Sequence, residues 1–128
     1  MQAPIDHHFI ARLLGMGRIA IGVALVLAPR RFGRSWVGAA AESGGGRLAL
    51  RATGARDIAI GYGVVRALDS GDPSTRLWVT LAGGCDLADA AATLAAYRSL
   101  PKRKRALSLV VSAGAAASAF VARDRIGR

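Results

Sequence analysis

The chain has 128 residues, enough for one domain, and carries a net charge of +10 with 52% hydrophobic, 5% aromatic and 20% charged residues. A soluble domain usually has about a quarter of its residues charged, so this composition favours a membrane protein with closely packed helices. The single cysteine, Cys85, excludes an intrachain disulfide and a thiol-based metal site.

Apolar segments in chain order predict an all-α fold. They cover residues 9–28, 48–68, 77–97 and 106–122, and we expect a four-helix transmembrane bundle that forms a single domain, 1–128. At about 1.5 Å per residue these helices would be roughly 25–32 Å long, close to the thickness of a hydrocarbon core. The glycine-rich stretch 42–46 is expected to be a flexible link between the first two helices.

The first and second segments repeat one pattern, R-x-x-G-x-x-x-I-A-I-G, at residues 12–22 and 51–61. One substitution inside the repeat reverses a charge, because the first copy has Arg18 where the second has Asp57. The helical period places the flanking glycines on the same face as these two residues. Consecutive spanning helices run antiparallel, so we expect the glycines of one copy to oppose those of the other. Arg18 and Asp57 would then form a structural ion pair, and exchanging the two charges should restore what either single change loses.

The second segment needs a partner to enter a bilayer. Arg56 and Asp57 near its centre each cost about 2.5–3.5 kcal/mol, whereas each Leu, Ile or Val returns only about 0.3–0.6 kcal/mol. The segment holds seven such apolar residues, so the sum is unfavourable. A neighbouring helix must therefore neutralise its charges.

The third segment carries two carboxylates, Asp86 and Asp89, three residues apart on one helix face. Two nearby carboxylates repel each other, and a low dielectric favours the protonated form of one of them. The pattern is typical of a proton carrier, a cation site or a general acid. The structural alternative is that both pair with arginines, namely Arg56 and either Arg12 or Arg51. The candidate binding residues are Arg56, Asp86, Asp89, Thr93 and Tyr97, and Asp86 and Asp89 are the candidate catalytic residues if the protein is an enzyme.

A soluble alternative is an alanine-rich bundle with its charges on a wet face. In that case residues 9–28 would have only two charges to cover their exposed side, and residues 106–122 would have none. A surface helix needs a wide polar stripe, so the membrane interpretation is favoured.

The basic residues indicate the orientation and the partners. The loops 29–47 and 98–105 carry nine Lys and Arg residues, so the positive-inside rule places both loops in the cytoplasm and both termini outside. No basic face interleaved with aromatic residues is present, which argues against nucleic-acid binding. The expected partners are the lipid bilayer and either a second copy, as a homo-oligomer, or a partner membrane subunit. No metal and no cofactor are predicted, and Asp6, His7 and His8 are interpreted as a solvated N-terminal arm.

The run R-x-x-G-x-R-D-x-x-x-G at residues 51–61, together with Asp86 and Asp89, resembles small uncharacterised bacterial four-helix integral membrane proteins, known mainly as domains of unknown function. The resemblance covers most of the chain and implies a four-helix membrane fold. It carries over no catalytic or ligand-binding residue.

Three functions follow from these patterns. The first is a small multi-pass membrane protein whose internal Arg/Asp cluster lines a polar cavity for binding or passage of a small solute or proton. The second is a membrane-embedded enzyme of isomerase, cyclase or epoxide-opening type, with a buried Asp as general acid on a lipophilic substrate. The third is a non-catalytic assembly subunit. An elongated apolar pocket at the aspartates would favour the enzyme, a wet path would favour transport, and no cavity would favour the assembly subunit.

Overall fold

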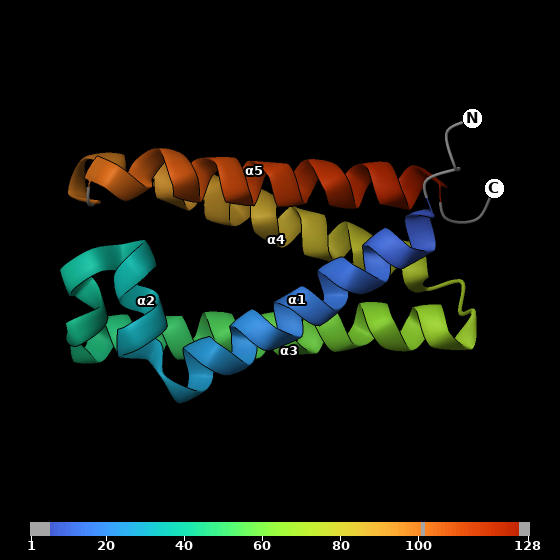
Figure 1. Cartoon of the computed structure of the whole chain (residues 1–128), viewed down its shortest axis with the longest axis horizontal. Coiled ribbons are helices and arrows are strands. Elements are labelled where there is room, and N and C mark those ends of the chain that lie inside the picture. Colours follow the sequence, from blue (N-terminus) through green and yellow to red (C-terminus); the bar gives the residue numbers. More distant parts are fainter. Residues whose placement is uncertain (1–5, 101, 126–128) are drawn as a thin grey trace.

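A computed structural model describes residues 6–100 and 102–125, and within these ranges the chain is helical with no strand (Figure 1). The prediction of an all-α fold is therefore confirmed. The elements are α1 (His7–Leu27), α2 (Pro29–Val37), the 3-10 helix η1 (Gly38–Glu42), α3 (Gly44–Ser70), α4 (Thr75–Ala95), the 3-10 helix η2 (Tyr97–Ser99) and α5 (Lys102–Arg125).

The long helices form two pairs. Helix α1 crosses α3 in an antiparallel pair, and α4 lies beside α5 in a second one (Figure 1). The start of α1, the turn between α3 and α4, and the end of α5 lie at one end of the molecule. Helix α2, the start of α3 and the end of α4 lie at the other end. By length and composition, α1 is the one helix in the described part of the chain that could cross a membrane.

Local signals explain where the helices begin and end. The Asp6 carboxylate accepts hydrogen bonds from the backbone N–H groups of His8 (3.0 Å) and Phe9 (3.1 Å), which caps α1. Ser43 caps α3 in the same way through the N–H of Gly46, at 2.9 Å. Gly71 ends α3 with a left-handed φ of 62°, which glycine adopts without steric cost.

The segment 29–47, predicted as a loop, contains helix α2 and the first turn of α3. Pro29 does end α1, but it also occupies the first turn of α2, where a missing N–H costs nothing. The stretch 44–46 is not a flexible link, because it forms the first turn of α3 behind its Ser43 cap. Gly46 is needed there, since a side chain would collide with the carbonyl of Ala40. Helix α4, predicted as 77–97, ends at Ala95, two residues before the predicted end. Tyr97 lies in η2.

The glycines of the repeat bring α1 and α3 into close contact, as the pattern predicts. A Cβ on Gly22 would lie 2.5 Å from the carbonyl oxygen of Gly54, and one on Gly61 would lie 2.5 Å from that of Gly15. Both distances are too short for any side chain. The helices can therefore pack at this spacing only because both positions are glycine.

The interior combines alanines with a few larger aliphatic side chains and the buried polar residues Asp57, Thr75 and Thr93. One buried cluster joins Ala11, Val64, Val79 and Ala119, and a second joins Leu25, Ala41 and Leu50. Many large apolar side chains instead point outward on every long helix, for example Leu13, Leu48, Leu87 and Val110. The buried clusters therefore leave a large share of the Leu, Ile and Val side chains on the surface.

Candidate functional site

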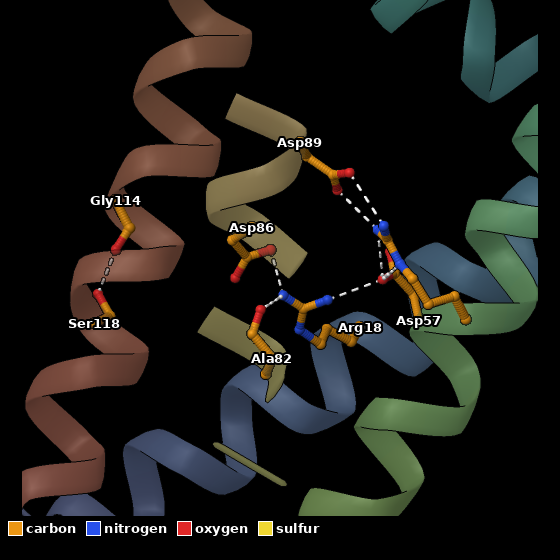
Figure 2. Close-up of polar contacts among 8 residues, drawn as sticks. Arg18, Asp57, Ala82, Asp86, Asp89, Gly114 and Ser118 are labelled. Carbon is orange, nitrogen blue, oxygen red and sulfur yellow. Dashed lines mark hydrogen bonds and ion pairs between the residues drawn. The ribbon is translucent and has the colours of Figure 1, made fainter. Parts of the chain in front are cut away.

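The Arg18 side chain leaves α1 and reaches both α3 and α4 (Figure 2). One guanidinium nitrogen, Nη1, donates to Oδ1 of Asp57 at 2.9 Å. The other, Nη2, donates to the carbonyl oxygen of Ala82 at 2.9 Å and forms an ion pair with Oδ1 of Asp86. Arg18 therefore joins three helices at one point.

A second arginine extends this arrangement into a network. Arg56 contacts Asp89 with two parallel hydrogen bonds, of 3.1 Å from Nη1 and 2.8 Å from Nη2. Its Nη2 also lies 3.2 Å from Oδ1 of Asp57, so Asp57 bridges the two arginines. The bidentate geometry is the strongest form of an arginine–carboxylate contact.

The network is most enclosed around Arg18. The side chains of Arg18, Asp57 and Asp86 are 12%, 12% and 14% exposed, whereas Arg56 and Asp89 are 31% and 23% exposed. Three carboxylates here face two guanidiniums, which leaves one net negative charge within the bundle. A net charge in a partly buried cluster is costly, so a further positive charge or a proton would stabilise the network.

A groove of about 230 Å³ opens beside Arg18, Asp57 and Asp86, between α1, α4 and α5. Its walls are mainly apolar and are formed by Leu13, Leu14, Ile21, Ala115, Ala119 and their neighbours. The ion pair of Asp86 with Arg18 is made through Oδ1 (Figure 2). Asp57 and Asp86 both pair with a guanidinium and line the groove, but Asp57 contacts two arginines and Asp86 contacts one.

The structure brings together most of the candidate residues named from the sequence. Arg18 contacts Asp57, and Arg56 contacts Asp89, as expected. Thr93 is buried one turn beyond Asp89. Tyr97 lies further on in η2 and is outside the groove and the network contacts described above.

The structural alternative, in which the two aspartates pair with Arg56 and with either Arg12 or Arg51, holds for Arg56 alone. Arg12 forms an ion pair with Asp69 near the end of the α1–α3 pair. Arg51 donates from Nε to the carbonyl oxygen of Val26, at 3.2 Å. Asp86 pairs with Arg18 instead, because Arg18 lies at the level of the bundle where α4 passes α1.

Two features of the site have no signal in the sequence. The carbonyl of Ala82 accepts a hydrogen bond from Arg18 within a helix, and Ala115 and Ala119 contribute the α5 wall of the groove. Alanines carry no pattern that separates a groove wall from an ordinary helix contact. Their role follows only from how α4 and α5 pack together.

The chain was compared with protein-family models, curated proteins and solved structures, and none of the three comparisons finds a match. The function is therefore argued from the geometry of the network and its groove.

Proposed function

We propose that this chain is a four-helix integral membrane protein that binds one proton at Asp86, inside the bilayer. Helices α1, α3, α4 and α5 have 21, 27, 21 and 24 residues, so at about 1.5 Å per residue each is long enough to span a core of roughly 30 Å.

The distribution of apolar side chains supports the membrane placement. Leu and Val side chains cover the outside of the long helices, while the charged network lies within. Only 22% of the most apolar stretch of α1 is buried, unlike the core helix of a soluble protein. Helices α3 and α4 have a lower mean hydropathy than α1, and network residues such as Arg56 and Asp89 contribute to it. These two side chains contact each other, so in the proposed placement they would not face lipid.

The charge balance of the network is the observation that carries the proton assignment. With three carboxylates for two guanidiniums, a single bound proton makes the network neutral. Asp89 receives two hydrogen bonds from Arg56, and Asp57 contacts both arginines. Asp86 contacts one guanidinium and lines the groove, so it is the site where the proton is best held.

A proton fits this site better than a metal ion does. Hard cations such as Ca²⁺ take six to eight oxygen ligands. Asp86 and Asp57 are the acidic side chains that line the groove, and the other walls are largely apolar. A proton needs only one carboxylate oxygen, such as the one of Asp86 that does not pair with Arg18.

The proposal includes an orientation in the membrane and a partner subunit. The basic loops 29–47 and 98–105 would face the cytoplasm, which leaves the α3–α4 turn outside. A homo-oligomer or a partner membrane subunit would add a further wall to the groove beside Asp86, which is open along one side.

Infrared spectroscopy of the protein in lipid vesicles tests the proton directly. At neutral pH the wild-type protein should show the carbonyl stretching band of a protonated carboxylic acid, and D86N should lack it. D89N leaves two carboxylates for two guanidiniums, so the band should fall there as well. D124N, at the exposed end of α5, is the matched control and should keep the band. A wild-type spectrum without the band, or a band unchanged in D86N, would contradict the proposal.

The apolar groove favours one second candidate, in which Asp86 donates its proton to a lipophilic substrate as a general acid. The same variant separates the two functions. If the protein is an enzyme, wild-type protein incubated with a lipid extract should form a product that D86N does not. If it binds a proton for transport, acidification of vesicles driven by a pH gradient should depend on Asp86 with no product formed.

A further inference from the structure

A second pocket, of about 410 Å³, lies between α3 and α4 close to the turn that joins them. It shares no residue with the groove at Asp86, so it is a separate site. Its lining combines the charged side chains Arg66 and Asp72, the hydroxyl residues Ser70 and Ser74, and the aromatic rings of Tyr62 and Trp78.

The pocket is polar at one end and apolar at the other. Ala59, Gly63, Arg66 and Ser70 follow one another at intervals of three or four residues and so lie along one face of α3. From Ala59 to Ser70 this face is roughly 16 Å long at 1.5 Å per residue. The polar side chains lie toward the turn, and the apolar ones lie toward the middle of the helix.

Tight packing fixes the apolar wall. The ring of Trp78 lies directly against Gly63, where a Cβ would collide with it. The indole therefore packs against the backbone of α3 and forms the apolar wall of the pocket.

Each charged side chain of the pocket is available to a ligand. Among the described residues, Arg66 takes part in none of the ion pairs that join the other arginines to carboxylates. The Asp72 carboxylate accepts the backbone N–H of Ser74 at 2.7 Å through Oδ1. This hydrogen bond holds the pKa of Asp72 below its usual value, so the group stays ionised at neutral pH.

We infer that this pocket binds the headgroup of a phospholipid that carries both a phosphate and a primary ammonium group, that is, phosphatidylethanolamine. Arg66 would bind the phosphate and Asp72 the ammonium, while Tyr62 and Trp78 would pack against the glycerol and the first acyl carbons. Aromatic side chains are typical of this depth in a bilayer. The inference rests on the proposed membrane placement, which puts the α3–α4 turn at the lipid–water interface.

Native mass spectrometry of the full chain released from detergent micelles tests this inference. Phosphatidylethanolamine and phosphatidylglycerol are added at equal concentration, and bound lipid is counted on the wild-type protein and on variants. R66Q should weaken phosphatidylethanolamine binding about tenfold, which corresponds to roughly 1.4 kcal/mol. R76Q removes an exposed arginine from the same turn region, outside the pocket, and is the matched control that should leave binding unchanged.

D72N separates headgroup recognition from general attraction to anions. The asparagine oxygen can still accept the Ser74 N–H, so the turn keeps its hydrogen bond while the negative charge is lost. This variant should lose its preference for phosphatidylethanolamine over phosphatidylglycerol. Equal losses in R66Q and R76Q, or an unchanged preference in D72N, would overturn the inference. Neither outcome would contradict the proposed membrane placement. The membrane placement is tested separately, by whether the protein stays in the membrane fraction before any detergent is added.

Discussion

Arg18 is the side chain on which the internal network depends, because it contacts Asp57 and Asp86 on two different helices. Replacing it with glutamine leaves three carboxylates to one guanidinium. Breaking a buried ion pair from one side costs roughly 3–5 kcal/mol, so R18Q should strongly destabilise the fold. D57N should cost less, roughly 1–3 kcal/mol, because Arg18 keeps Asp86 and Arg56 keeps Asp89. Thermal unfolding in detergent measures both, and a D57N protein less stable than R18Q would contradict this ranking.

The exchange of charges between positions 18 and 57 is no longer expected to restore stability. An arginine at 57 would adjoin Arg56, and an aspartate at 18 would face Asp86. The repeat in the sequence pointed to the Arg18–Asp57 contact because both residues occupy the same place in one pattern. It could not indicate Asp86 as a further partner, since no repeat fixes how α4 is rotated about its own axis.

At the scale of the elements, the contact of α1 with α3 depends on the glycines of the repeat. G22A would place a Cβ 2.5 Å from the carbonyl oxygen of Gly54 and 2.8 Å from a side-chain carbon of Ile58. Overpacking of this kind costs roughly 1–3 kcal/mol, so the unfolding temperature should fall. Gly17 lies in the same helix with nothing within 4 Å of a Cβ, so G17A should be neutral or stabilising by up to about 1 kcal/mol. Equal effects of the two substitutions would show that close approach at Gly22 is unimportant.

The long helices could be predicted from the sequence because apolar segments of about 20 residues are separated by turn-forming residues. Helix α2 could not, since a proline at position 29 predicts the end of one helix, whereas it also begins the next. The start of α3 was missed for a related reason. Three consecutive glycines suggest flexibility, but the Ser43 cap and the close contact of Gly46 with Ala40 order them as a helical turn.

At the scale of the whole molecule, the proposed membrane placement rests on where charged and apolar side chains lie. The charged residues in the middle of α1, α3 and α4 face one another, and their partners come from different helices. The long helices also present exposed Leu, Ile and Val side chains. By hydropathy α1 alone among the described helices qualifies as a span, so the proposal for the other long helices depends on the pairing of their internal charges.

The membrane placement is tested most directly by thiol labelling at position 87, in the middle of α4. Leu87 is 58% exposed, so L87C in a chain with Cys85 replaced by alanine would react readily in water. We predict that a membrane-impermeant maleimide fails to label L87C in intact membranes, because lipid covers this face. P73C, at the exposed α3–α4 turn, should react from outside the cell and is the positive control. Labelling of L87C as fast as P73C would contradict the account of a bilayer-embedded bundle.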